Sequence, residues 1–268
     1  MKRSIALLVL ALLLPAAAVS AQGTGTSEPK AVVGEKYWIE FTATFWRPAL
    51  KGSVQTDDLD VVGSRIDLAS DLALDNSQAL DLRLILRPAK KHRFRLQYTP
   101  NEATGDGFLT RDITIAGEEY PVSLPVHSFL SWRVLRVGYE WDFFYRPRGF
   151  VGVVVETGFV NMRAGIDSLL GSAEVFGEAP LVAVGLAGRF YPIPNLAIHM
   201  EGTGLTLTNL SPENEIDTLS LDFSATYNFT RNFGVAGGWR RNDTRLKIDT
   251  DQGDVNFRGF WLGGTIRY

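Results

Sequence analysis

The stretch Val255-Asn-Phe-Arg-Gly-Phe-Trp-Leu-Gly-Gly-Thr-Ile-Arg-Tyr268 decides the fold of this chain. Counted back from Tyr268, its residues separate into two alternating sets. The first set is Ile266, Gly264, Leu262 and Phe260, and the second is Arg267, Thr265, Gly263 and Trp261. Alternation over about ten residues that ends on an aromatic residue is typical of a strand that crosses a membrane in a closed β-barrel.

The pattern Gly263-x-x-Ile266-x-Tyr268 resembles the carboxy-terminal assembly signal of bacterial outer-membrane barrels. That signal usually ends in Phe and has a polar residue before the glycine, whereas Tyr268 and Leu262 stand at those places here. The resemblance implies a small outer-membrane protein, similar in general character to the OmpW type. It also implies that the barrel-assembly machinery of a Gram-negative-type bacterium recognises the last strand.

The amino terminus predicts export. Lys2 and Arg3 precede an apolar run over residues 5–14, and a small-residue cleavage pattern ends at Ala21. We therefore expect a signal peptide over residues 1–21, because the apolar run is too short to span a bilayer as a retained anchor. The Gly, Thr and Ser content of residues 22–34 predicts a flexible lead-in. Residues 35–268 are expected to form a single barrel domain.

Composition excludes several classes of protein. The chain contains no cysteine, so disulfides, thiolate chemistry and Cys-ligated metals are excluded. Its formal net charge is −3 and like charges do not gather in blocks, which argues against nucleic acid as a partner. We expect no cofactor and no metal. Outer-membrane lipid is the expected surrounding medium.

Alternation along the rest of the chain predicts ten strands, with eight or twelve as alternatives. The predicted strands are 37–46, 80–87, 92–99, 134–145, 150–162, 180–191, 196–207, 218–229, 233–248 and 255–268. Every second connection is short and the others are mostly much longer, for example around 47–79, 100–125 and 165–178. Outer-membrane barrels show this asymmetry, with short periplasmic turns, long external loops and both termini in the periplasm. A soluble sandwich or a lipocalin-like barrel would instead turn its apolar face inward.

The polar face of these strands carries charges of both signs, which we expect in the barrel lumen. The lumen-facing candidates are Glu40, Asp81, Arg83, Arg95, Arg136, Glu140, Glu156, Arg189, His199, Glu201 and Asp222, and the same polar face also carries Arg87, Arg93, Asp142 and Arg267. In the first strand, alternation assigns Tyr37 to the lipid face and Trp38 to the lumen. Barrels of ~8 strands are filled by side chains and open pores need ~16. Two interpretations remain: a lumen plugged by ion pairs, or a narrow polar conduit.

Catalysis has weak support. His199 and Glu201 share a face and form a candidate base–carboxylate pair, while Ser220 and Ser224 point inward from the next strand. The spacing does not match the His-x-Ser motif of outer-membrane lipid A deacylases or the His-Ser motif of outer-membrane phospholipases. His127 and the next residue, a serine, face opposite ways in a strand. We therefore interpret His199 as structural and assign no catalytic residue.

The first long loop contains acidic and apolar residues. Its aspartates are Asp57, Asp58, Asp60, Asp67, Asp71 and Asp75, and its apolar residues include Ile66, Leu68, Leu72 and Leu74. Close carboxylates can bind Ca²⁺, but the glycine-turn spacing of a calcium loop is missing, so a solvated acidic loop is the default interpretation. The apolar residues are candidates to cap the barrel mouth or to line a lipid-accessible pocket.

These features predict a structural or surface-interaction role for an outer-membrane barrel with a narrow or plugged lumen. The second hypothesis is a porin-like passive channel or transporter for small hydrophobic solutes, which proteins of the OmpW and FadL types release sideways into the membrane. An outer-membrane lipid hydrolase is the third hypothesis.

Overall fold

The structure is a computed structural model that describes residues 32–55, 65–74, 76–115, 118–211, 214–248 and 251–268. The predicted signal peptide and most of the predicted lead-in lie outside the described residues, as do Asp57, Asp58, Asp60 and Asp75 of the acidic loop. The described residues from 32 onward belong to one compact unit. Within them, no helix is long and apolar enough to cross a membrane.

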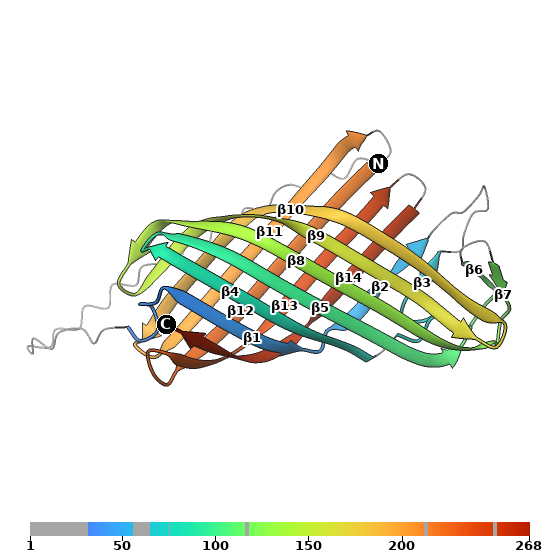
Figure 1. Ribbon diagram of the computed structural model, residues 1–268, viewed down its shortest axis with the longest axis horizontal. Helices are drawn as coiled ribbons and strands as arrows, with labels where there is room; N and C mark the ends of the chain where they lie inside the picture. Colours follow the sequence, from blue (N-terminus) through green and yellow to red (C-terminus); the bar gives the residue numbers. More distant parts are fainter. Residues whose placement is uncertain (1–31, 56–64, 75, 116–117, 212–213, 249–250) are drawn as a thin grey trace, which may run out of the picture. The chain divides into compact units, whose positions relative to one another are not determined.

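The unit is a closed antiparallel β-barrel (Figure 1). Nine strands are continuous, and the tenth consists of β1 and β2, which pair one after the other with β14. β1 also pairs with β4, so the first and last strands of the barrel close the sheet. The barrel strands are β1 Ile39–Trp46, β2 Ala49–Gln55, β4 Asn76–Ala89, β5 His92–Phe108, β8 Pro125–Arg146, β9 Gly149–Ser168, β10 Gly171–Ile193, β11 Leu196–Ser211, β12 Asn214–Asn228, β13 Phe233–Ile248 and β14 Asp251–Arg267.

The two ends of the barrel differ. At one end lie the short turns after β4, β8, β10 and β12, together with Tyr268 and the start of β1; we refer to it as the turn end. At the other, the loop end, lie the short strands β3 Ile66–Asp67, β6 Ile113–Ile115 and β7 Glu118–Tyr120, and the connections after β9, β11 and β13. Since each barrel strand runs between these two ends, its residues can be ordered by height along the wall.

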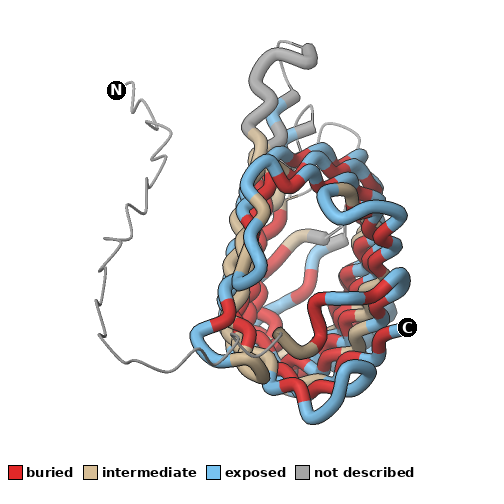
Figure 2. The backbone as a smooth tube through the Cα atoms, turned by 90° about the vertical axis from the view of Figure 1, so that its left-hand side faces the viewer, coloured by how far each residue is buried: buried red, intermediate tan, exposed pale blue. Residues whose placement is uncertain are grey.

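The wall is much taller than a membrane crossing requires. β8, β9 and β10 contain 22, 20 and 23 residues, whereas about 9–11 tilted residues cross a bilayer. The predicted loop over residues 165–178 is wrong, because β9 and β10 continue through it and connect at Leu169 and Leu170. Buried and exposed residues alternate along the barrel wall (Figure 2). β10 keeps this alternation through most of its additional residues, whereas Ala164, Gly165 and Ile166 of β9 are all buried, and the two strands extend the wall as a hairpin.

The polarity of the two faces inverts partway along the wall, and β8 shows this clearly. In its turn-end half, Leu135, Val137, Tyr139 and Trp141 are exposed outward, while Arg136, Glu140 and Asp142 point inward. In its loop-end half the inward residues are apolar except for Ser128 (Val126, Leu130, Trp132 and Val134), and the outward ones include His127 and Arg133. The inversion falls at Val134 and Leu135, where two consecutive residues are apolar. A polar lumen, as predicted, therefore fills only the turn-end half.

An apolar core fills the loop-end half of the barrel. It is built from several strands and from the segment 66–74, whose leucines are at most 2% exposed. Its main members are Trp46, Leu50, Val54, Ile66, Leu68, Leu72, Leu74, Leu109, Ile113, Val126, Leu130, Trp132, Ile166, Val255, Phe257 and Trp261. Burial of this many large side chains away from water stabilises the part of the barrel that extends beyond the lipid.

The start of the first strand corrects one prediction. Tyr37, predicted on the lipid face, is only 7% exposed and points inward, whereas Trp38, predicted in the lumen, is 66% exposed. β1 begins at Ile39, so its alternation does not extend to the two residues that precede the strand. Gly34 has a φ of +85°, and a Cβ on it would lie 2.8 Å from the Asn228 side chain, so this position requires glycine.

Candidate functional site

The lumen of the turn-end half contains a balanced set of charges, which we name the lumen network. Its eight arginines are Arg83, Arg87, Arg93, Arg95, Arg136, Arg189, Arg240 and Arg267, and its eight carboxylates are Glu35, Glu40, Asp81, Glu140, Asp142, Glu156, Glu201 and Asp222. Strand alternation positions them, because residues two apart on one strand share a face. All eleven candidates from the sequence lie in this network or, for His199, beside it.

Arg93 is the centre of the network at the turn end. Its side chain is 1% exposed, and its nitrogens lie 2.7 Å from Glu140, 2.5 Å from Asp142 and 3.3 Å from Glu35. The guanidinium also lies 3.8 Å from the centroid of the Phe150 ring. Three carboxylates and an aromatic face fix the cation from several sides, as a buried guanidinium requires.

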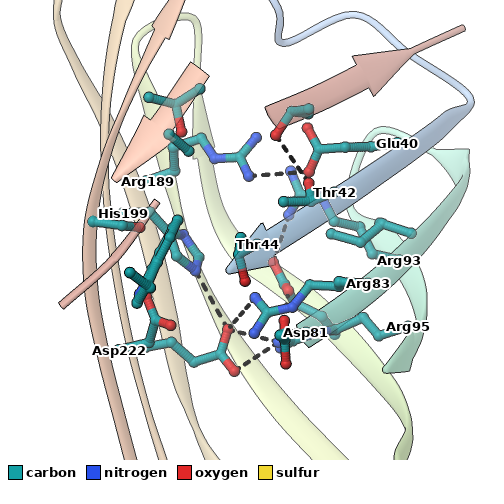
Figure 3. Close-up of a pocket in the computed structure, with 18 of the residues that line it drawn as sticks. Glu40, Thr42, Thr44, Asp81, Arg83, Arg93, Arg95, Arg189, His199 and Asp222 are labelled. Carbon is teal, nitrogen blue, oxygen red and sulfur yellow. Dashed lines mark hydrogen bonds and ion pairs between the residues drawn. The ribbon is translucent and has the colours of Figure 1, made fainter. Parts of the chain in front are cut away.

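The first and last strands meet at Glu40. Arg267 of β14 donates a hydrogen bond to its carboxylate, and Arg189 of β10 approaches it to 3.4 Å from across the lumen. Arg267 also donates to the Asn228 side-chain oxygen at 2.6 Å. Glu40 therefore connects the closing seam of the barrel to the opposite wall. Figure 3 shows Glu40 and Arg189 facing each other.

Glu201 is the centre of the middle layer. Arg95 donates to both of its oxygens at 2.6 Å, Arg83 lies 3.5 Å away, and His199 lies 3.3 Å away. The predicted pair of His199 and Glu201 is thus close in space. The same carboxylate also holds the two arginines, so His199 shares Glu201 with Arg83 and Arg95.

Towards the loop end, Arg240 closes the network. It donates to Asp222 at 2.6 Å and approaches Asp81 to 3.0 Å. Its guanidinium also lies 5.7 Å from the Trp46 ring and 5.6 Å from the Trp261 ring. Since both tryptophans belong to the apolar core, Arg240 joins the charged and apolar halves of the interior.

Side chains leave little space in the lumen network. The cavity among Glu40, Asp81, Arg95, His199 and their neighbours measures about 50 Å³. At roughly 10–15 Å³ for each water centre it holds only a few water molecules. Arg136 is the least tightly paired arginine, at 3.9 Å from Glu156. The side chains of the lumen network therefore fill most of the turn-end half of the barrel.

Sequence reasoning missed Glu35 and Arg240. Glu35 lies next to the predicted lead-in, outside any strand, yet it is 5% exposed and accepts a hydrogen bond from the Tyr191 hydroxyl at 2.7 Å. The backbone N–H of Val33, within that lead-in, donates to the Pro194 carbonyl at 2.8 Å. Arg240 belongs to a strand whose two faces both carry arginine, so composition alone could not assign its side.

The other candidates lie apart from the lumen network. His127 is outward and exposed, 2.7 Å from Asp106, while the Ser128 side chain is fully buried. In the acidic loop, Asp67 accepts hydrogen bonds from the backbone of Ala69 and Ser70, and it therefore shapes a turn. No group of three or more His, Asp or Glu among the described residues is arranged to hold a metal ion.

Comparison with known proteins identifies the fold. No protein-family model matches the chain, and no curated protein matches its sequence. The outer-membrane protease OmpT of Escherichia coli matches over 92% of this chain and 100% of its own, with a TM-score of 0.53 and 10% identity. An outer-membrane channel of Pseudomonas putida F1 matches over 90% and 100%, with a TM-score of 0.41 and 8% identity. Ail of Yersinia pestis matches over 86% of this chain and 99% of its own, with a TM-score of 0.39 and 11% identity.

The chain therefore has the fold of the bacterial outer-membrane β-barrels, with the ten strands that the sequence predicts. At these identities the likeness concerns the fold alone, so the role of the chain has to be argued from its own residues.

Proposed function

We propose that this protein is a closed outer-membrane barrel that presents a rigid platform outside the cell for surface interactions. The observation that supports this proposal is that both halves of the interior are filled, one by the lumen network and the other by the apolar core. We place the turn end and both termini in the periplasm, because short turns and long loops are distributed in this way in outer-membrane barrels. The last strand, with Gly263, Ile266 and Tyr268, is proposed as the signal for the barrel-assembly machinery.

The filled interior supports this role over conduction. Ion channels use rings of one sign of charge or open constrictions, whereas the lumen network has equal numbers of both signs. Planar-bilayer recording of the refolded full chain is the direct test. We expect no discrete conductance steps from protein whose heat-modifiable gel mobility shows that it is folded. Stable single-channel steps would refute the proposal.

A second candidate role is passage of small hydrophobic solutes, and one observation favours it. β1 pairs with β4 only up to Trp46 and Ala79, and beyond that point β2 pairs with β14 and β3 instead. The segment 66–74 covers the interior there: a Cβ on Gly105 of β5 would lie 2.0 Å from the Ala73 carbonyl oxygen. Movement of this segment would open the wall directly above the lipid.

A disulfide lock tests that second role. Ser53 and Asp67 are paired across β2 and β3, and the chain has no native cysteine. The double variant Ser53→Cys/Asp67→Cys would hold the segment closed when oxidised. We expect equal permeation of a labelled hydrophobic solute in the oxidised and reduced states. Loss of permeation on oxidation alone would establish the transporter role in place of the platform role.

No catalytic role is proposed. Replacement of His199 by Ala should leave any lipid hydrolysis by outer-membrane preparations unchanged. A hydrolytic activity that disappears in this variant, while the barrel remains heat-modifiable, would instead support the hydrolase hypothesis.

A further inference from the structure

Four cations gather on the outer wall where β13, β14 and the junction of β1 with β2 lie side by side. Arg241 and Arg258 are directly opposite each other, and Arg258 is in turn opposite Ala49. Arg47 and Lys51 are two residues to either side of Ala49 on the same strand line. We name Arg47, Lys51, Arg241 and Arg258 the rim cluster.

The rim cluster has an excess of positive charge. Among the described residues, the carboxylate that forms an ion pair with the rim cluster is Asp243, 2.7 Å from Arg241. Lys51 and Arg258 are exposed and form no ion pair with any described residue. Arg47 lies over the Phe45 ring at 5.5 Å. Because like charges directly opposite on paired strands destabilise a sheet, the juxtaposition of Arg241 and Arg258 is favourable when an anion lies between them.

The height of the rim cluster matches one surface of the membrane. Arg258 is ten residues from Tyr268 along β14. At ~3.4 Å per residue and a tilt of ~40° this spans about 25 Å of height, the thickness of the apolar band of a membrane barrel. Immediately on the lipid side of Arg241 and Arg258 lies the aromatic pair of Trp239 and Phe260. The cations therefore lie at headgroup level and the aromatic residues at the level of the acyl chains.

A polar groove adjoins the rim cluster on the side away from the lipid. It has a volume of about 420 Å³, and its lining contains three cations, three carboxylates and three uncharged residues: Lys51, Arg65, Arg111, Asp67, Asp71, Asp254, Gly52, Ser53 and Asn256. Pockets of ~300–1,000 Å³ accommodate compact organic ligands. Lys51 belongs both to the groove and to the rim cluster, so a headgroup whose phosphate lies on the cations extends its remaining polar part into the groove.

We propose that the rim cluster and this groove form a binding site for a phosphorylated glycolipid of the outer leaflet, of the lipid A class. The cations bind the phosphate, the groove takes the saccharide, and Trp239 and Phe260 pack against the acyl chains. The assignment to the outer leaflet rests on the orientation given under Proposed function. The chemistry of the site is independent of that orientation. A glycolipid fits better than a glycerophospholipid because the groove offers several hydrogen-bonding side chains beyond the phosphate site.

The test compares two variants of the refolded full chain in detergent by native mass spectrometry. The site variant Lys51→Gln/Arg258→Gln removes the two unpaired cations. The control Lys90→Gln/Lys91→Gln removes the same charge from exposed positions in the turn after β4, at the opposite end of the barrel. The probes are bisphosphorylated lipid A, dephosphorylated lipid A and phosphatidylglycerol. We expect at least about tenfold weaker binding of bisphosphorylated lipid A to the site variant and less than about twofold change for the control, because charge-assisted hydrogen bonds contribute strongly.

Three outcomes would overturn the site. They are equal binding of dephosphorylated lipid A, equal weakening in the control variant, and binding of phosphatidylglycerol as tight as that of lipid A. Heat-modifiable mobility verifies that each variant is folded. Because binding in detergent depends neither on conductance nor on orientation, failure here is distinguishable from failure of the platform proposal, which bilayer recording and surface labelling address.

Discussion

Arg93 illustrates how single residues hold the interior together. A buried charge that has lost its partner costs several kcal/mol of stability. This applies to the Arg93 guanidinium without its carboxylates, and to the carboxylates without Arg93. Whether ion pairing compensates for the loss of hydration depends on how closely the charges approach. The three contacts of Arg93, at 2.5–3.3 Å, are short enough for pairing to compensate.

Replacement of Arg93 by Met should destabilise the barrel strongly. The change leaves Glu35, Glu140 and Asp142 without their common cation, and breaking a buried ion pair costs about 3–5 kcal/mol. Urea unfolding in lipid vesicles, followed by tryptophan fluorescence, measures this effect. The control is Arg163→Ala, because the pair of Arg163 and Glu174 is exposed and such pairs contribute about 0–1 kcal/mol. Equal losses in the two variants would contradict a central role of Arg93.

At the scale of elements, β14 carries phenylalanine on both its inward and its outward face. Phe257 is 3% exposed and belongs to the apolar core, whereas Phe260, three residues along the strand, is 80% exposed on the outer wall. The same residue type thus has opposite environments on one strand.

Phe257→Ala should cost about 3–5 kcal/mol, because it leaves a cavity beside Trp46 and Trp132, whose ring centroids lie 6.4 and 5.9 Å from its own. Phe260→Ala should change the free energy of unfolding in detergent by no more than about 0.5 kcal/mol, as at other surface positions. Parallel urea titrations of the two variants measure the difference. A loss at Phe260 as large as that at Phe257 would show that outward packing dominates instead.

The segment 66–74 should loosen in acid through Asp71. Burial raises the pKa of this carboxyl, but hydrogen bonds from Arg111, Asp67 and Thr110 outweigh burial and hold the pKa below its ordinary value of 3.8. A carboxyl with a lowered folded-state pKa contributes stability above the unfolded value, and that contribution is lost as the pH falls below 3.8.

A nitroxide attached to Ser70→Cys reports this loosening by electron paramagnetic resonance. Its mobility should increase as the pH is lowered below 3.8, the ordinary value for Asp. In the background of Asp71→Asn the mobility should be higher at neutral pH and nearly independent of pH in that range. A parallel acid response in both backgrounds would exclude Asp71 as the cause. The effect is small, because Arg111 is half exposed and solvent screens its charge.

The elements at the turn end were predictable from the sequence, whereas those at the loop end were not. Proline-containing turns such as Arg146–Gly149 separate strands whose outward faces are uniformly apolar, so both the boundary and the face were evident. Beyond Val134 the faces exchange polarity, and the pattern then resembles a polar loop although the strand continues. Burial of Glu35 depends on contacts with β5 and β10 that no local pattern encodes.

At the scale of the whole molecule, the orientation of the barrel can be tested in intact cells. Leu169 lies at the tip of the hairpin of β9 and β10, and Arg148 lies in the turn between β8 and β9 at the opposite end. Since the chain has no cysteine, single cysteines there are unique labels. A membrane-impermeant maleimide should label Leu169→Cys on whole cells and Arg148→Cys only after the outer membrane is opened. The reverse pattern would place the turn end outside.

The inversion of polarity along the strands also determines how deeply the protein sits in its bilayer. A shift of the barrel by two residues towards the turn end would place Arg241 and Arg258 in hydrocarbon, and a shift towards the loop end would expose Phe260 and Leu262 to water. Both displacements are unfavourable, so the immersion depth is encoded in the covalent sequence. When the protein meets a membrane of different thickness, the surrounding lipids have to stretch or compress to match it, and the height of the loop end above the membrane stays constant.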